Sequence, residues 1–491
     1  MPSIRVSCSL LLLAAAALAV PADRLEKRAP PTVTLDQGTF VGEADGDVNN
    51  FLGIPFGKPP YVSVSSHLAV WLIRLSSQNR KLAFQSPVAV DAYTGTYNVS
   101  AYGPSCPQQA QNLAELPSDV VDYANTTMFA SVETSDEDCL SLNVIVPNGA
   151  QIGDDLPVAV VGGSSMYGER GVVVKRSIAM NEPTIFVSMN YRKEVKEAGV
   201  GNLGLQDQRL ALHWVQKYIS QFGGDPSKVT IWGESAGAIS VAMHMITNGG
   251  DTEGLFRGAF MQSGSPIPVG DIEHGQGDYD AIAVDASPSI FSYQSLRLAW
   301  LPRQLVLDGS VADVPFVSGF AQYIKEIYVP DITDAELDTL LSAYPATSPR
   351  APVRHRRPQR DHAPVQAHRA FQGDLVFNAA RRFFIQQRAD DQPVYSFLSK
   401  RFKWVPTLGS VHASDLLNVF GPAELTDYLV NFANNLDPNG ATVPVWPQYS
   451  VAEPQLMTFV DGLRNRTEIT TDDFRNESMA YVVELALKYP L

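Results

Sequence analysis

Short apolar runs alternate with segments of helical length from Cys139 onward. The segment from Leu205 to Phe222 has the length and spacing of a helix. Strands that alternate with helices in this way pack as a mostly parallel sheet with helices on both faces. The pattern therefore predicts an α/β fold. The apolar runs that we expect to form strands here are Leu142 to Val146, Val158 to Val161, Thr184 to Met189 and Val229 to Trp232.

The chain ahead of this alternation has a different pattern. Between Thr32 and Gly53 the apolar positions fall in short runs broken by Gly and Asp, which is typical of strands at an antiparallel edge. No internal repeat is visible, and no linker clearly separates two domains. We therefore expect a single α/β domain over residues 29–491.

Residues 1–28 have the features of a secretory signal followed by a short pro-segment. Arg5 precedes an apolar run that ends in small residues at Ala17 and Ala19. The run is too short to stay in a bilayer as a span. Lys27 and Arg28 form a dibasic pair of the kind that processing enzymes cut. We expect a secreted, extracellular chain that begins near residue 29 and has no transmembrane anchor.

The charge balance narrows the range of partners. The 491 residues are 45% hydrophobic, enough for a large core, and carry a formal net charge of -15. Such a charge repels phosphate backbones, so no nucleic acid is expected as a partner. The arginine-rich run Arg350 to Arg360 is a local exception, and a nucleic-acid site there is the least favoured interpretation.

Cysteines and glycosylation signals agree with export. Of the three cysteines, Cys8 leaves with the signal, so only Cys106 and Cys139 remain to pair under oxidising conditions. Asparagines followed two residues later by Ser or Thr are acceptors for N-glycosylation. They are Asn98, Asn125, Asn465 and Asn476.

The motif Gly-Glu-Ser-Ala-Gly at residues 233–237 is the strongest candidate for chemistry. It matches G-x-S-x-G and stands between an expected strand and the expected helix Ala236 to Ile246. A tight turn there holds Ser235 in a strained conformation with its hydroxyl above the sheet, and the flanking glycines leave room for the turn. The Ala236 amide, at the helix N-terminus, is placed to bind an oxyanion. The alternative is a chance serine in a Gly-rich turn.

A serine hydroxyl becomes a good nucleophile only when an imidazole takes its proton. In folds with this motif the histidine comes late in the chain, on a loop after a strand. His412 fits, because it follows the expected strand Val394 to Leu398. The others precede the serine, lie on its helix, or belong to Gly-rich or Arg-rich stretches: His67, His213, His244, His274, His355, His362 and His368.

A second oxyanion donor is expected from the loop after the strand ending at Val161. Gly162 and Gly163 lead into Ser164 and Ser165 there, and glycines let a backbone approach a substrate closely. An ordinary Gly-Ser turn is the alternative. A serine, a histidine and backbone amides suffice for acyl transfer from an ester to water, so we expect no metal and no cofactor.

Several stretches in order resemble the type-B carboxylesterase/lipase family, which includes secreted fungal lipases, sterol esterases and cholinesterases. The resemblance implies an α/β-hydrolase fold and an ester or lipid substrate, met at a lipid–water interface. It also implies that Ser235 is the nucleophile, His412 the base and Gly163 with Ala236 the oxyanion hole, and that Cys106 pairs with Cys139. The matching stretches are Phe51–Gly57, Gly103–Cys106, Glu137–Asn143, Asn190–Arg192, Asn202–Arg209, Phe222–Pro226, Gly233–Gly237 and Phe260–Gly264.

One departure from the family concerns the catalytic acid. The family has a Glu followed by Gly a few residues beyond a strand similar to Val314–Gly319. Here Gly319 runs into Phe320-Ala-Gln-Tyr, and Glu326 stands at the wrong spacing, so the acid stays unassigned. Two hypotheses follow: an ester hydrolase that works through an acyl-enzyme, or a catalytically impaired binding protein on the same fold.

Overall fold

The computed structural model describes most of the chain from residue 29. The described residues are 29–59, 85–108, 134–163, 171–192, 202–267, 316–320, 333–344, 371, 373–403, 410, 412–421, 423–462 and 466–489. The expected signal and pro-segment, and the sequons at Asn125 and Asn465, lie outside these ranges. The single domain over 29–491 stays a prediction.

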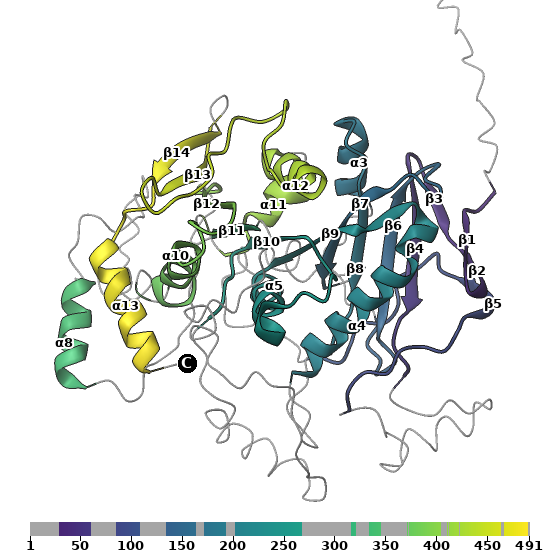
Figure 1. Ribbon diagram of the computed structural model, residues 1–491, viewed down its shortest axis with the longest axis horizontal. Helices are drawn as coiled ribbons and strands as arrows, with labels where there is room; N and C mark the ends of the chain where they lie inside the picture. The colour runs from purple at the N-terminus through teal and green to yellow at the C-terminus, as the bar shows by residue number, and fades with distance from the viewer. Residues whose placement is uncertain are drawn as a thin grey trace, which may run out of the picture.

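A long twisted sheet runs through the described part of the molecule (Figure 1). Its strand order is β14-β13-β12-β11-β10-β9-β7-β8-β6-β4-β3. From β13 to β8 every neighbouring pair is parallel, whereas β14 at one end and β6, β4 and β3 at the other pair antiparallel. The bounds are β3 Glu43–Asp45, β4 Val48–Pro55, β6 Ser141–Pro147, β7 Leu156–Gly162, β8 Ile185–Met189, β9 Gly224–Glu234, β10 Gly258–Gln262, β11 Phe316–Phe320, β12 Val394–Lys400, β13 Gln455–Val460 and β14 Thr467–Thr471.

The sheet confirms the expected α/β class and shows the direction of one expected strand. The run from Leu142 to Val146 lies in β6, which is antiparallel to β8 and therefore belongs to the antiparallel end of the sheet. Only a short turn at 148–155 separates β6 from β7. A parallel connection needs a crossover of a dozen or more residues, so β6 cannot begin the parallel part.

The antiparallel edge expected before Gly53 is present. In addition to β3 and β4, a small sheet is formed by β1 (Thr32–Leu35), β2 (Gln37–Val41) and β5 (Thr94–Asn98). Phe40 of β2 stacks on Tyr97 of β5, with ring centroids 4.5 Å apart, and meets Tyr93 edge to face. These aromatic contacts join β5 to the start of the chain.

Helices cover both faces of the large sheet, each over its own core (Figure 1). On one face, buried residues of α4 (Leu203–Tyr218), η2 (Ile219–Phe222), α5 (Ala236–Ile246) and α10 (Ala379–Gln386) pack on the sheet. On the other, α3 (Val172–Ala179) and α12 (Glu424–Asn435) do so, together with Trp446. The expected helix Leu205 to Phe222 is thus α4 with η2. The other helices of the described residues are η3 (Thr247–Gly250), α8 (Asp334–Ala343), η4 (Asp374–Asn378), α11 (Leu416–Val419) and α13 (Asn476–Lys488).

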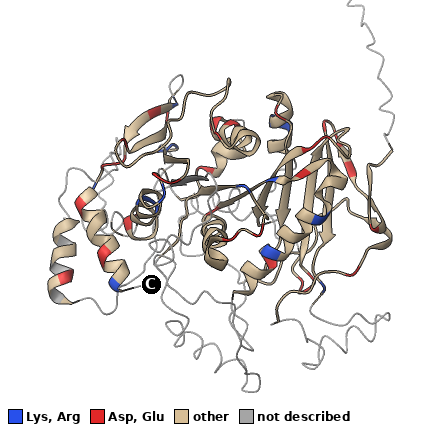
Figure 2. Ribbon diagram, viewed as in Figure 1, with Lys and Arg blue, Asp and Glu red and all other residues tan. Residues whose placement is uncertain are grey.

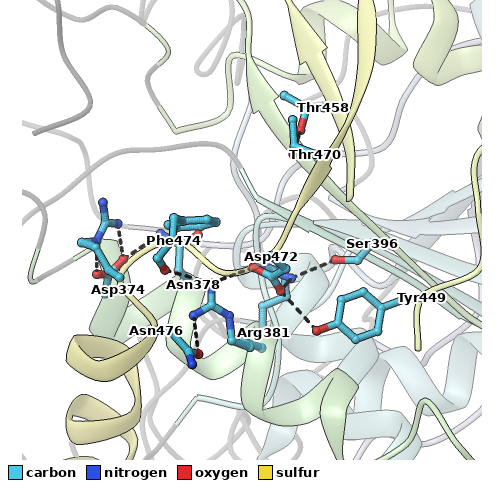
Figure 3. Close-up of polar contacts among 12 residues, drawn as sticks. Asp374, Asn378, Arg381, Ser396, Tyr449, Thr458, Thr470, Asp472, Phe474 and Asn476 are labelled. Carbon is cyan, nitrogen blue, oxygen red and sulfur yellow. Dashed lines mark hydrogen bonds and ion pairs between the residues drawn. The ribbon is translucent and has the colours of Figure 1, made fainter. Parts of the chain in front are cut away.

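A buried ionic network joins α10 to the turn after β14 (Figure 3). The Asp472 carboxylate accepts from Arg381 Nη2 at 2.8 Å and from Arg382 Nη2 at 2.7 Å. Arg381 also donates to Ser396 Oγ of β12 at 3.0 Å. All three charged side chains are at most 5% exposed. Burial alone raises the pKa of Asp472, but the two guanidinium groups outweigh it and lower that pKa to about 2.

We expect Asp472→Asn to be strongly destabilising. The substitution leaves two buried guanidinium groups without a carboxylate, and breaking a buried pair in this way costs about 3 to 5 kcal/mol. Denaturant or thermal unfolding measures the loss. Asp45→Asn is the control, because Asp45 pairs with Lys175 at an exposed site, where an ion pair contributes about 1 kcal/mol or less. Equal effects of the two changes would contradict the prediction.

The low pKa of Asp472 also fixes the direction of a pH effect. Its ionised form is stabilised in the folded state, so its contribution is present above the ordinary Asp value of 3.8 and is lost as the pH falls towards about 2. Asp472→Asn should lack this part of the acid destabilisation.

Other expected features also lie within the described residues. Cys106 and Cys139 form a disulfide, which confirms the expected pair. Asn98 at the end of β5 and Asn476 at the start of α13 are exposed. Acidic and basic residues are interspersed over the described elements (Figure 2). Among the described residues no helix is both long and apolar enough to cross a membrane.

Candidate active site

Ser235 stands at a sharp bend between β9 and α5, near the centre of the sheet. Its backbone has φ 55° and ψ -119°, a region that costs a non-glycine residue about 1 to 3 kcal/mol. Two backbone hydrogen bonds hold it there: the Ser235 N–H donates to the Gln262 carbonyl oxygen, and the Ile239 N–H donates to that of Ser235, both at 2.9 Å. The neighbouring strand β10 and the first turn of α5 thus impose the strained conformation that the motif predicts.

The two glycines of the motif have different roles. A Cβ on Gly233 would lie 2.2 Å from the Gly237 carbonyl carbon and 2.6 Å from the Ala238 nitrogen, both backbone atoms. A Cβ on Gly237 would meet no such atom within 4 Å. Sequence reasoning gave both glycines the same task of leaving room for the turn. The structure assigns it to Gly233, because the first turn of α5 passes directly over that residue.

Gly233→Ala should disrupt the site, whereas Gly237→Ala should be tolerated. The first change forces the start of α5 away from β9 and displaces Ser235, and a shift of about 1 Å in a reacting group costs on the order of 100-fold in rate. The second replaces Gly by Ala within a helix, which should raise the stability of the protein by about 1 kcal/mol or less. Steady-state ester hydrolysis and thermal unfolding of both variants test this. Similar loss in both would refute the distinction.

His412 is held in place by contacts on both sides of it in the sequence. Before it, Ser410 Oγ donates to the carbonyl oxygen of Arg401 at 2.5 Å. After it, Asn418 Oδ1 of α11 accepts from Arg401 Nη1 at 2.6 Å. Arg401, just beyond β12, therefore fixes the loop that carries His412. The imidazole also packs on the Phe377 ring of η4, with centroids 4.9 Å apart.

The structure brings Ser235 and His412 into contact across 177 positions of sequence. His412 Nε2 lies 2.7 Å from Ser235 Oγ, which is within hydrogen-bond reach for proton transfer. The imidazole is 13% exposed, so water competes little with this contact. The two residues that the sequence selected on separate grounds thus form one pair.

The two amides expected to bind the oxyanion, those of Ala236 and Gly163, differ in whether they are already hydrogen-bonded. Ala236 begins α5, where the amide has no acceptor within the helix, and the residue is exposed next to Ser235. Gly163 ends the described part of its loop with φ 97°, and its N–H donates to the Met189 carbonyl oxygen at 2.9 Å. For Gly163 to donate to an oxyanion, that hydrogen bond has to be released.

Two buried carboxylates that sequence reasoning passed over lie beside the pair. Glu234 is 7% exposed, and its Oε1 is 3.5 Å from His412 Nε2. Asp415, three residues after His412, is 0% exposed. Burial first, and then the charge of Asp415, raises the pKa of Glu234. Burial also raises the pKa of Asp415. The sequence signal for Glu234 was its position in the Gly-x-Ser-x-Gly motif, and the signal for Asp415 was its position three residues after His412.

The family places its catalytic acid a few residues beyond the strand that corresponds to β11. β11 lies between β10 and β12, but residues 321–332, including Glu326, lie outside the described ranges. The acid therefore stays unassigned.

Another histidine on the nucleophile's helix is structural. His244 is 4% exposed and contacts Gln208 Oε1 of α4 at 3.0 Å. Burial, followed by the nearby charge of Arg209, lowers the pKa of His244 to about 3, so it stays neutral between α4 and α5. Among the described residues, no group of three or more His, Cys, Asp or Glu side chains is placed to hold a metal ion.

Comparison with known sequences gives consistent matches. The model of the carboxylesterase family matches residues 78–281. A secreted triacylglycerol lipase of Gibberella zeae is 31% identical, over 93% of this chain and 90% of its own length. A secreted lipase of Botryotinia fuckeliana is 32% identical, over 96% and 97% respectively. Lipase 4 of Diutina rugosa is 33% identical, over 86% and 90%.

Comparison with solved structures addresses the fold. The crystal structure of Aspergillus niger EstA is similar with a TM-score of 0.71 and 21% sequence identity, over 94% of this chain and 99% of EstA. This likeness, together with the parallel sheet and its two helical layers, confirms the α/β-hydrolase fold expected from the sequence.

Proposed function

The chain belongs to the carboxylesterase family, and we propose that it is a carboxylic ester hydrolase with Ser235 as nucleophile and His412 as general base. The observation that carries the proposal is the 2.7 Å contact between Ser235 Oγ and His412 Nε2 at the bend between β9 and α5. Acyl transfer to a serine needs such a pair, because the alcohol is a poor nucleophile until a base removes its proton.

The first half of the reaction transfers the acyl group to Ser235. Its Oγ attacks the ester carbonyl carbon while His412 Nε2 takes the hydroxyl proton. The negative charge that develops on the carbonyl oxygen is bound by the Ala236 amide and, once released from Met189, by the Gly163 amide. The imidazolium then returns the proton to the leaving alkoxide. An alcohol departs, and the acyl group remains on Ser235.

The second half hydrolyses the acyl-enzyme. Water takes the place of the alcohol, His412 removes its proton, and the resulting hydroxide attacks the acyl carbon. Collapse of this intermediate releases the carboxylic acid, and the proton returns to Ser235 Oγ. Every proton in the cycle passes through one imidazole nitrogen, so Nε2 starts each half-reaction unprotonated and the proton of the neutral ring resides on Nδ1.

The substrate class and compartment follow from the relatives' names. Two of the similar proteins are named secreted lipases, one of them a triacylglycerol lipase. We therefore propose that this chain acts on lipid esters at a lipid–water interface, outside the cell. The expected signal at residues 1–28 supports export.

A fluorophosphonate probe together with p-nitrophenyl ester turnover tests the function. A fluorophosphonate phosphonylates a serine rapidly only if an adjacent base activates it. We expect covalent labelling at Ser235 and turnover of acyl esters by the wild-type protein. Folded protein that neither labels nor turns over esters would instead support the catalytically impaired binding protein.

A further inference from the structure

Behind the Ser235–His412 pair lies a buried acidic pair, Glu234 and Asp415. Glu234 ends β9 in register with Gln262 of β10, and Gln262 Nε2 contacts Asp415 Oδ2 at 3.2 Å, so both carboxyl groups lie next to Gln262. Both are at most 7% exposed. Among the described residues, Glu234 Oε1 and Asp415 Oδ1 have no hydrogen-bond partner. Two desolvated carboxylates next to one side chain do not both ionise at neutral pH, because like charges in a low dielectric repel strongly.

Hydrogen-bond donors are distributed unequally over the pair. Trp232 Nε1 donates to Gln262 Oε1 at 2.5 Å, which fixes the orientation of the Gln262 amide. Gln262 Nε2 then donates to Asp415 Oδ2 at 3.2 Å, and Ser263 Oγ donates to the same oxygen at 3.5 Å. Donors favour the ionised form of a carboxyl group. The charge of the pair therefore belongs on Asp415 and the proton on Glu234.

We propose that Glu234 and Asp415 hold one proton and one negative charge between them and act as positioning residues for His412. This inference rests on the proposed roles of Ser235 and His412. During acylation the imidazole becomes a cation, and the buried anion on Asp415, three residues along the same loop, stabilises it. The proton on Glu234 keeps that anion from sitting directly on Nε2, where it would hold the imidazole protonated and unable to act as a base.

Other charged groups near the site are engaged elsewhere. On η4, Asp374 binds Arg475, with a closest contact of 2.5 Å. Beyond β12, Arg401 binds Glu424 at 2.8 Å. On α10, Arg381 binds Asp472. On α5, His244 is neutral and bonded to Gln208. Within the described residues, the Glu234 carboxylate contacts His412 Nε2, and Asp415 is the buried carboxylate on the loop that carries His412.

The pH dependence of kcat/KM gives a signature that a packing role would not produce. In Asp415→Asn the charge should move to Glu234, 3.5 Å from Nε2, and favour the protonated imidazole. The acid limb then shifts to higher pH by about one unit. In Glu234→Gln the charge stays on Asp415, so the limb should stay close to that of the wild type. In the double variant no charge remains, so the limb shifts to lower pH and kcat falls about tenfold.

Asp45→Asn is the matched control, because it removes one carboxylate at an exposed site and should leave the limb unchanged. The proposal would be overturned if all three variants of Glu234 and Asp415 lost activity while the acid limb of kcat/KM stayed at the wild-type pH. It would also be overturned if the acid limb of Asp415→Asn shifted to lower pH.

An infrared measurement keeps the test independent of turnover. In the Ser235→Ala protein at neutral pH we expect the C=O stretch of a protonated, buried carboxyl group. That band should disappear when Glu234→Gln is added, and also when Asp415→Asn is added, because Glu234 then ionises. A band that persists in either double variant would refute the shared proton. A wild-type protein without hydrolysis or labelling would instead refute the proposed function, and the infrared result would still be readable.

Discussion

Ser235→Ala is expected to abolish fluorophosphonate labelling and to lower kcat for ester hydrolysis by about 10⁶-fold, the cost of removing the nucleophile in a serine protease. The change removes the only atom that forms the acyl-enzyme bond in the proposed reaction. Alanine also lacks the hydroxyl that His412 Nε2 contacts at 2.7 Å. Rate measurements with p-nitrophenyl esters, and mass spectrometry of the probe-treated protein, give the two readouts.

The fold should survive this substitution. Ser235 adopts φ 55° because Gln262 and Ile239 bond to its backbone, and those bonds do not involve the side chain. Alanine in that conformation keeps the strain, so stability should change little. Ser227→Ala, at an exposed serine bonded to Asp225, is the control and should keep full activity. Labelled Ser235→Ala protein would mean that another serine is the nucleophile.

His412→Gln should lower kcat by at least about 10⁴-fold while leaving a slow route to labelling. Without the imidazole, Ser235 keeps its place at the bend but has no base to take its proton. The probe should therefore still react with Ser235 on long incubation, in contrast to Ser235→Ala, where it should not react at all. His213→Gln is the control, because His213 is 53% exposed and lies beside Glu253.

Combining the two changes separates a catalytic pair from two independent effects. If Ser235 and His412 act as a unit, the double variant should be no slower than Ser235→Ala. The reason is that removing either residue already removes the contribution that the two make together. Multiplication of the two losses would show that the residues act separately and would contradict the proposed mechanism.

Local pattern was enough for the elements and for the choice of the candidate pair. The helix Ala236 to Ile246 and the strand before it were predictable because apolar periodicity and the Gly-x-Ser-x-Gly turn are encoded within a few residues. His412 was selected by its place after a strand. The same local signals counted Leu142 to Val146 among the strands of a mostly parallel sheet but could not give its direction, because strand direction depends on the length of the connection to β7 and on the neighbours that pair with it.

What only the tertiary structure decided were the relations between distant positions. The sequence placed a serine on a bend and a histidine on a late loop, but their 2.7 Å contact depends on Arg401 fixing that loop. It treated Gly233 and Gly237 alike, although only Gly233 lies against the backbone of the first turn of α5. It left Glu234 as an unspecified position in a motif, because two features that only the fold creates raise its pKa: its burial at the end of β9 and the charge of Asp415, 181 residues later.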